Sequence, residues 1–118
     1  MKHPAFESDG RILIAEVEVA DTVLGRMRGY LGRDNPGPGH GLLLNPCGSV
    51  HTFGMRFVLD LIFLSREGAV CKVLAAVAPG RIAWGGWRAH HVIETPAGWL
   101  DLSLLPMGAR VRPMPLAA

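Results

Sequence analysis

The sequence has few cysteines and no long apolar run. Its two cysteines, Cys47 and Cys71, permit at most one disulfide bond and lack the spacing of zinc ligands. No stretch approaches the roughly 20 apolar residues of a membrane-spanning helix, and the first residues lack the apolar segment of a secretory signal. We therefore expect no transmembrane segment, no metal and no cofactor. We expect a cytoplasmic location with both thiols reduced if the chain is complete, and leave the location open if an N-terminal signal has been removed.

Charge of either sign is also scarce. Charged residues make up 19% of the chain, and the net charge is +2 with histidine neutral. Lysine occurs only at Lys2 and Lys72, and the arginines are scattered along the chain. Domains that bind nucleic acid concentrate basic residues on one face, often with aromatic residues for stacking. The sequence therefore predicts no nucleic-acid partner.

Apolar residues, glycine and proline are abundant. A chain of 118 residues suits one domain, and a hydrophobic content of 49% is typical of a globular protein that buries a core without disulfides. The counts of Gly 15 and Pro 9 indicate many turns between short strands. We predict a mainly β fold, an antiparallel β-sandwich or barrel-like domain, over residues 11–118. Residues 1–10 are predicted to be a flexible lead-in.

Short apolar runs place the expected strands. Residues 57–64 and 69–78 flank the turn Arg66-Glu67-Gly68 and predict a hairpin. Apolar and polar residues alternate toward the end of residues 11–20, which is typical of a half-buried strand. Further strands are expected at residues 42–44, 89–95, 99–105 and 109–114.

One short helix is expected near the N-terminus. Asp21 can cap a helix over residues 22–31. Leu24, Met27 and Leu31 recur there at helical spacing. Two glycines inside this segment each cost about 1 kcal/mol of helix stability relative to alanine. We therefore expect this helix to form only by packing its apolar stripe on a sheet.

Three motifs resemble a known family. The chain reads Cys-Gly-Ser-Val-His-Thr-Phe-Gly-Met-Arg-Phe over residues 47–57, followed by Leu59-Asp60 and Phe63-Leu64. It reads Val-Ile-Glu-Thr-Pro-Ala-Gly over residues 92–98, after Pro79 and Arg81, and Arg-Gly-Tyr-Leu-Gly-Arg over residues 28–33. Together, over roughly residues 15–113, they resemble domain-of-unknown-function family 192. The resemblance implies a compact β-sandwich or barrel-like domain with one helix, found in bacterial and archaeal proteins, and implies no activity.

Three titratable residues are candidates for catalysis. Asp60 shares a strand face with apolar residues, where an ionised carboxylate is costly unless it is paired. It is therefore either hydrogen-bonded inside the fold or a site carboxylate with a perturbed pKa. Glu94 alternates with Val92, so it is either paired with an arginine or part of a site. His51 is either bonded to a backbone carbonyl or available as an acid, a base or a metal ligand.

Loops near these residues carry candidates for binding. Trp84 and Trp87 flank two glycines in an expected loop, close to arginines. We predict that loops at one end of the sheet bind a small polar or anionic ligand or a partner peptide. The predicted binding residues are His51, Thr52, Arg56, Arg81 and Trp84.

Two other functions stay open. A hydrolase-like or metal-assisted enzyme would use His51 with Asp60 or Glu94. A structural or interaction protein would need no pocket chemistry, and an apolar patch around Leu104, Leu105 and Met107 would favour a symmetric dimer. The sequence allows a monomer or a homodimer.

Overall fold

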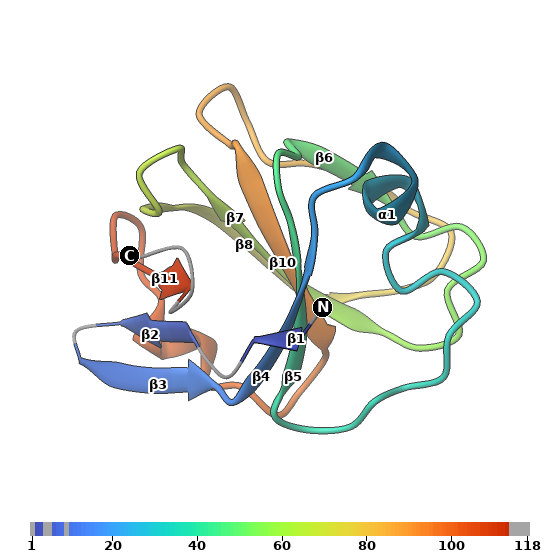
Figure 1. The fold of residues 1–118 in the computed structure, drawn as a ribbon, viewed down its shortest axis with the longest axis horizontal. Helices are drawn as coiled ribbons and strands as arrows, with labels where there is room; N and C mark the ends of the chain where they lie inside the picture. The colour runs from blue at the N-terminus through green and yellow to red at the C-terminus, as the bar shows by residue number, and fades with distance from the viewer. Residues whose placement is uncertain (1, 4–5, 9, 114–118) are drawn as a thin grey trace.

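Strands dominate the structure, a computed structural model that describes residues 2–3, 6–8 and 10–113 (Figure 1). Within these residues the largest sheet has six strands in the order β1-β4-β5-β10-β7-β8, and two small sheets have the orders β11-β2-β3 and β6-β9. The strands are β1 (Lys2–His3), β2 (Phe6–Ser8), β3 (Arg11–Ile14), β4 (Glu16–Ala20), β5 (His40–Leu44), β6 (Ser49–His51), β7 (Leu59–Leu64), β8 (Val70–Val77), β9 (Ile82–Trp84), β10 (His91–Pro96) and β11 (Arg112–Pro113). The prediction of a mainly β fold is confirmed.

The apolar runs of the sequence form the middle of the large sheet. All residues of β7 are buried, as are four of the five in β5. β7 and β8 form the predicted hairpin, with Leu59 opposite Val77 and Leu64 opposite Val70. Because successive side chains of a strand point to opposite faces, a strand that is buried throughout needs cover on both faces of its sheet.

Two apolar clusters provide that cover. The first cluster includes Leu43, Ile62 and Ile93 of the large sheet, and residues from β3 and the C-terminal segment pack on it. The second cluster includes Leu42, Leu61 and Phe63 on the opposite face, where Tyr30, Met55 and Ala83 pack. The second face is therefore covered by the segment that follows the helix and by the β6–β9 ribbon, and this is the face that carries the candidate site.

One strand pair departs from the predicted antiparallel arrangement. β4 and β5 run parallel, with Glu16 opposite His40 and Ala20 opposite Leu44. Parallel neighbours need a crossover connection. Residues 21–39 make that crossover, and they carry the helix α1 (Val23–Arg28) on the side of the sheet where β6 lies (Figure 1).

The helix is shorter than the segment expected at residues 22–31. Thr22 caps it, in place of the predicted Asp21, because the Thr22 side chain accepts a hydrogen bond of 3.0 Å from the Gly25 N–H. Gly29 ends it with φ of 51°, a left-handed conformation that favours glycine.

The expected apolar stripe of this helix does not pack on a sheet. The side chains of Leu24 and Met27 are 79% and 68% exposed, and no residue of α1 is buried. The expectation that docking alone would form the helix is wrong. The crossover holds both of its ends, and two of its apolar residues, Val23 and Met27, line a pocket instead.

Both terminal regions also differ from the prediction. Parts of the expected lead-in, residues 1–10, form β1 and β2, whereas residues 1, 4–5 and 9 lie outside the described residues. In place of a strand at residues 99–105 there is a short 3-10 turn, η1 (Leu102–Leu104). Of the strand expected at 109–114, β11 is the described part, and residue 114 lies outside it.

The apolar patch expected for a dimer is not formed as predicted. Leu105 is buried in the first core cluster, and Leu104 packs against the same cluster. Met107 remains exposed. The turn η1 directs two of the three apolar side chains inward, so these residues do not make one surface patch.

Candidate functional site

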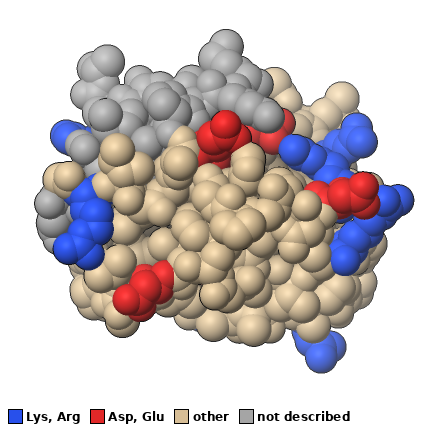
Figure 2. All heavy atoms as spheres, turned by 90° about the horizontal axis from the view of Figure 1, so that it is seen from below, with Lys and Arg blue, Asp and Glu red and all other residues tan. Residues whose placement is uncertain are grey.

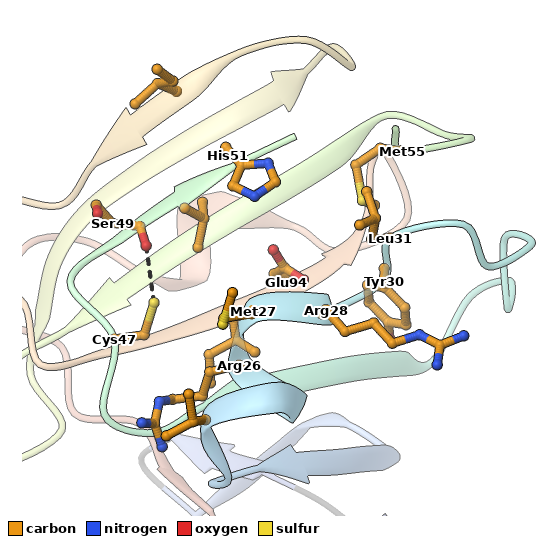
Figure 3. Close-up of a pocket in the computed structure, with 15 residues that line it drawn as sticks. Arg26, Met27, Arg28, Tyr30, Leu31, Cys47, Ser49, His51, Met55 and Glu94 are labelled. Carbon is orange, nitrogen blue, oxygen red and sulfur yellow. Dashed lines mark hydrogen bonds between the residues drawn. The ribbon is translucent and has the colours of Figure 1, made fainter. Parts of the chain in front are cut away.

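An open pocket of about 540 Å³ lies between α1, the β6–β9 ribbon and the second face of the large sheet (Figure 3). Most of its walls are apolar, and the residues that form them are Val23, Met27, Leu31, Leu44, Val50, Met55 and Ile82. Its polar and charged lining residues are Arg26, Arg28, Tyr30, Cys47, Ser49, His51 and Glu94.

Glu94 is the most buried charged residue of this pocket. Its position in β10, opposite Leu42 on one side and Leu61 on the other, puts its side chain on the second face. The residue is 3% exposed, and its Oε1 atom has no hydrogen-bond partner within the described part of the chain. Burial raises the pKa of the carboxyl to about 7, although a hydrogen bond from the Tyr30 backbone opposes the rise. Glu94 therefore exchanges between its neutral and ionised forms near neutral pH.

The end of α1 lies directly against this carboxyl. A Cβ atom at Gly29 would stand 2.8 Å from Oε1 of Glu94. Because Gly29 has no side chain, its backbone can approach the carboxyl closely. Its positive φ is a second reason for glycine at this position. Gly29 thus shapes the space around the unpartnered oxygen.

His51 and Cys47 reach the pocket from the ribbon. His51 is exposed in β6, and its ring lies beside that of Phe53 with centroids 5.6 Å apart. The Cys47 thiol donates a hydrogen bond of 3.0 Å to the Ser49 carbonyl oxygen, and burial raises its pKa. Figure 3 shows His51 and Glu94 facing the same cavity. The raised pKa keeps the Cys47 thiol in its protonated form, which is a poor nucleophile.

Arg26 and Arg28 border the pocket, but their charged groups point elsewhere. Figure 3 shows both guanidinium groups directed away from Glu94. Nη1 of Arg26 donates to the Asp21 carbonyl oxygen at 2.7 Å. Among the ion pairs of the described residues, none involves Glu94. The pairing with an arginine that the sequence suggested is therefore not formed within that part of the chain.

Asp60 lies on the other face of the sheet. It stands opposite Thr95, the neighbour of Glu94 in β10, so the two carboxyl groups point in opposite directions. Asp60 is buried and accepts hydrogen bonds from the backbone N–H groups of Ala76, at 2.8 Å, and Gly98, at 3.2 Å. The structure thus brings His51 and Glu94 to one pocket and leaves Asp60 outside it, bonded within the fold.

Thr52 and Arg81 are joined to each other through a buried hydroxyl. The Thr52 Oγ1 atom accepts a hydrogen bond of 2.7 Å from the Arg81 N–H and donates one of 2.8 Å to the Ala78 carbonyl oxygen. The Thr52 side chain is buried, so it faces no ligand-accessible space. These contacts hold β6 to the segment that leads into β9.

Arg56 and Trp84 lie outside the pocket. Arg56 forms an exposed ion pair of 3.0 Å with Asp34. Trp84 is the last residue of β9, in place of the predicted loop, because it pairs with Ser49 of β6. Its ring is 49% exposed and meets the Trp87 ring edge-on at 5.0 Å. Of the predicted binding residues, His51 alone lines the pocket.

The sequence missed the wall contributed by α1. Met27, Arg28 and Gly29 line the pocket, but helical spacing had placed Met27 on a buried stripe. The one available signal was Gly29 itself, since an unfavourable glycine in a helical segment often marks a close approach.

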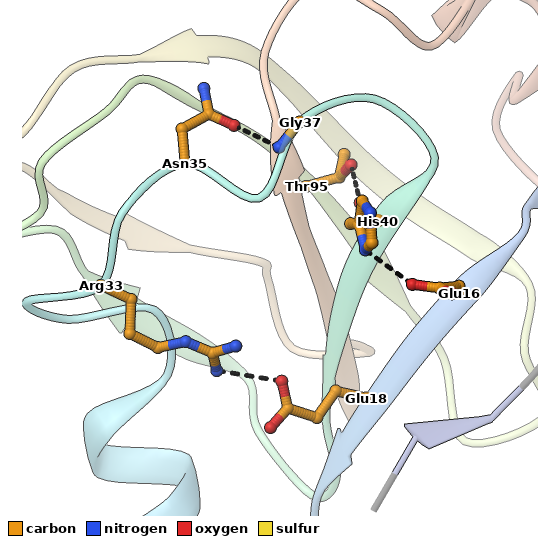
Figure 4. Close-up of polar contacts among 7 residues, drawn as sticks. All are labelled: Glu16, Glu18, Arg33, Asn35, Gly37, His40 and Thr95. Atoms are coloured by element: carbon orange, nitrogen blue, oxygen red, sulfur yellow. Dashed lines mark hydrogen bonds and ion pairs between the residues drawn. The ribbon is translucent and has the colours of Figure 1, made fainter.

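A separate polar network secures the crossover (Figure 4). Arg33 pairs with Glu18 of β4 at 2.9 Å, and His40 pairs with Glu16 at 3.1 Å. Thr95 donates a hydrogen bond of 2.6 Å to the His40 carbonyl oxygen. These bonds fix both ends of the loop that follows α1 and so help to position that wall of the pocket.

Within the described residues, no group of three or more His, Cys, Asp or Glu could hold a metal ion.

Two solved structures share this fold. A protein of unknown function from Novosphingobium aromaticivorans DSM 12444 superposes with a TM-score of 0.72 at 19% identity, covering 83% of this chain and 77% of that one. A protein from Sinorhizobium meliloti 1021, described as a "putative transcription regulator", has a TM-score of 0.70 at 23% identity, with 82% and 80% covered. At these identities the likeness shows the fold alone.

Comparison of the sequence with curated proteins and with family profiles shows to which family the chain belongs. No curated protein gives a significant match. In the part of the chain that the structure describes, no helix has the length and apolar character needed to cross a membrane. The sequence profile of DUF192, an "Uncharacterized ACR" family, matches residues 5–113. This match over most of the chain confirms the resemblance seen in the motifs, and the protein belongs to the DUF192 family.

Proposed function

We propose that the protein is a binding module that receives a small ligand, or one side chain of a partner peptide, in the pocket between α1 and β6. The observation that carries this proposal is the buried Oε1 atom of Glu94, which has no partner within the described residues and belongs to a residue that lines the pocket. A buried polar atom without a hydrogen bond costs about 1–3 kcal/mol. A ligand that supplies a donor recovers that cost, so Glu94 is suited to be a polar anchor.

The shape and lining of the pocket support the same proposal. Small-molecule sites are concave and mainly apolar, with a few polar groups that orient the ligand. Here Met27 of the helix and Ile82 of the ribbon both line the pocket, and 68% and 77% of their surfaces are exposed. A ligand between them would cover apolar surface that the fold leaves in water.

The buried carboxyl argues against an anionic ligand at this point of the pocket. An anion there would force Glu94 to remain protonated, and the guanidinium groups of Arg26 and Arg28 point away. We therefore narrow the expected small polar ligand to one that offers a hydrogen-bond donor beside an apolar group.

Binding accounts for the pocket better than catalysis does. General acid–base chemistry needs partners within hydrogen-bond reach of the reacting group. Asp60 points to the opposite face, and no hydrogen bond between His51 and Glu94 occurs among the described contacts. Cys47 is kept as a neutral thiol because burial raises its pKa.

The description of the Sinorhizobium meliloti protein as a regulator of transcription suggests a nucleic-acid ligand as an alternative. The face shown in Figure 2 is mostly uncharged, with lysines, arginines and acidic residues around its margin. A basic stripe of the kind that follows a phosphate backbone would support that alternative. The face shown carries no such stripe. We favour a small ligand or a peptide because the pocket beside Glu94 is mainly apolar.

The two cysteines allow a direct test of ligand occupancy. Both are free and half-buried, and burial raises the pKa of each thiol, but only Cys47 lines the pocket. We would follow alkylation by iodoacetamide at each thiol by mass spectrometry, with millimolar n-butanol, n-butylammonium or butanamide present. A compound that occupies the pocket should slow alkylation of Cys47 at least threefold and leave Cys71 unchanged.

A variant that fills the pocket serves as the control. Ser49 is exposed and borders the pocket, so Ser49→Trp should occupy the cavity and remove the protection, whereas Ser49→Ala should keep it. If none of the three compounds slows Cys47 selectively, or if Ser49→Trp retains the protection, the proposed function is wrong.

A further inference from the structure

We propose that the group which this pocket receives at Glu94 is an alkylammonium ion, carried either by a small amine or by the lysine side chain of a polypeptide. This inference rests on the proposed function, that the pocket binds a ligand. It adds a chemical class, and the class follows from three features of the pocket: an unpartnered carboxyl oxygen, apolar walls and the direction of the nearby charged groups.

The carboxyl oxygen sets the first requirement. Oε1 of Glu94 is buried, and the Gly29 backbone lies so close that a Cβ atom there would stand 2.8 Å away. An acceptor in such a confined space suits a compact donor. An ammonium group is compact and carries several N–H donors, whereas a guanidinium group is a wide planar fork. A hydrogen bond between an ammonium and a carboxylate is also roughly twice as strong as one between neutral groups.

The walls set the second requirement. Met27, Leu31, Met55 and Ile82 line the pocket with apolar side chains. The alkyl stem of an amine or a lysine can lie against apolar surface while its charged tip reaches a polar partner. A ligand that is polar along its whole length would leave donors or acceptors unmatched along these walls, and such groups are costly to bury.

None of the other titratable and charged groups that line the pocket forms an ion pair with Glu94 among the described residues. The guanidinium groups of Arg26 and Arg28, from α1, point away from the acid (Figure 3). Burial raises the pKa values of Tyr30, which follows α1, and of Cys47, which precedes β6, so both are neutral. His51 lies exposed in β6. Glu94 is therefore the one lining carboxyl, and it has no cation paired with it among the described residues.

Binding of an ammonium ion must then expel a proton. In the free protein, burial keeps much of Glu94 protonated at neutral pH, since its pKa is raised to about 7. An ammonium ion stabilises the carboxylate, so the acid proton passes to solvent as the charged hydrogen bond forms, and no covalent bond between protein and ligand is made. The affinity should rise with pH by about tenfold per unit below pH 7 and level off above it.

Isothermal titration calorimetry tests this class directly. We would titrate the protein with n-butylammonium, n-butanol and butyrate at pH 6 and pH 8, in two buffers of different ionisation enthalpy. Butylammonium should bind at least tenfold more tightly than butanol at pH 8, bind about tenfold more weakly at pH 6 than at pH 8, and release close to one proton at pH 6. Butyrate should bind most weakly.

Matched variants assign the effect to one carboxyl. Glu94→Gln should lose both the preference for butylammonium and the pH dependence, and it should still bind butanol. Glu18→Gln removes the same charge from a residue that pairs with Arg33 outside the pocket, and it should bind as the unmodified protein does. If Glu94→Gln does not fold, the pH profile and proton release of the unmodified protein decide the question alone.

The remaining outcomes separate the sources and the hypotheses. The capped tripeptide acetyl-Gly-Lys-Gly-amide should bind more tightly than butylammonium if the source is a polypeptide, and more weakly if it is a small amine. Equal affinities for butanol and butylammonium, or an affinity that does not change with pH, would overturn the ammonium assignment while leaving the pocket as a binding site. If no probe binds and Cys47 is never protected, the proposed function itself is overturned.

Discussion

A carboxyl oxygen of Asp60 accepts a hydrogen bond of 2.8 Å from the backbone N–H of Ala76. The pairing between β7 and β8 shifts its register between Leu59 and Leu61, directly at Asp60, and Ala76 has φ of 53°. A bulge of this kind leaves a backbone group without a partner on the neighbouring strand. The acid in the most apolar strand of the chain supplies that partner, which explains its presence in the core.

Removal of this acid should therefore lower stability. Asp60→Ala leaves the buried N–H groups of Ala76 and Gly98 without an acceptor, and we expect the free energy of unfolding to fall by about 2–4 kcal/mol. Urea denaturation measures the change. Protection of Cys47 by a bound compound should persist in the folded variant, because Asp60 faces away from the pocket. A loss below about 0.5 kcal/mol would contradict the structural role.

Thr52 gives a second test of a predicted binding residue that the structure places inside the fold. Thr52→Val keeps the shape but removes the hydroxyl that bonds to Arg81 and Ala78. We expect a loss of about 2 kcal/mol of unfolding free energy, and Thr52→Ser should recover most of it. Equal stability of the valine and serine variants would show that these hydrogen bonds do not matter.

Two glycines with positive φ test the close approach of the backbone to Glu94. Gly29 and Gly32 both have positive φ, at 51° and 72°, but only a Cβ at Gly29 would meet Glu94, since nothing lies within 4 Å of one at Gly32. Each alanine variant should lose at least about 1 kcal/mol because a Cβ atom disfavours positive φ. Gly29→Ala should lose a further 1–3 kcal/mol from the collision with the carboxyl. Thermal or urea unfolding compares the pair, and equal losses would refute the contact.

The raised pKa of Glu94 predicts how stability depends on pH. Between pH 4.5, the ordinary value, and about 7, the folded state holds a proton that the unfolded state has lost. The contribution of Glu94 to the free energy of unfolding should therefore be highest below this window and fall as pH rises through it, by at most about 3 kcal/mol, with no further change above it.

The variant Glu94→Gln should flatten that profile, because glutamine does not titrate. The free energy of unfolding of the variant, minus that of the unmodified protein, should be larger at pH 8 than at pH 5. Urea unfolding at a series of pH values makes the measurement, and Glu18→Gln again serves as the charge-matched control. A profile that is the same with and without Glu94 would show that its pKa is not raised.

Much of the sheet followed from local pattern. The apolar runs that form β5 and β7 were long enough to predict buried strands. The turn residues Arg66-Glu67-Gly68 predicted the hairpin of β7 and β8. Alternation with Val92 put Glu94 on an apolar face, where it lies. Each of these conclusions depends on residues close together in the chain.

Other features had no local signal. The stripe on α1 has the spacing of a buried helix face, yet Leu24 is 79% exposed and Met27 of the same stripe lines a pocket. Trp84 looked like a loop residue beside two glycines, yet it pairs with Ser49, 35 positions earlier in the chain. The sequence made Asp60 and Glu94 equally good candidates for a site carboxylate. Only the strand register shows that they lie on opposite faces of the sheet.

Local sequence pattern is sufficient to predict a mainly β chain, its central strands, and the side of β10 to which Glu94 points, since strand periodicity is a property of neighbouring residues. Long-range packing determines that β4 and β5 run parallel and that α1 and β6 enclose the second face. It also leaves one oxygen of Glu94 without a partner among the described residues. Those outcomes depend on which distant segments pack together, and each position along the chain carries too little information to specify its distant partners.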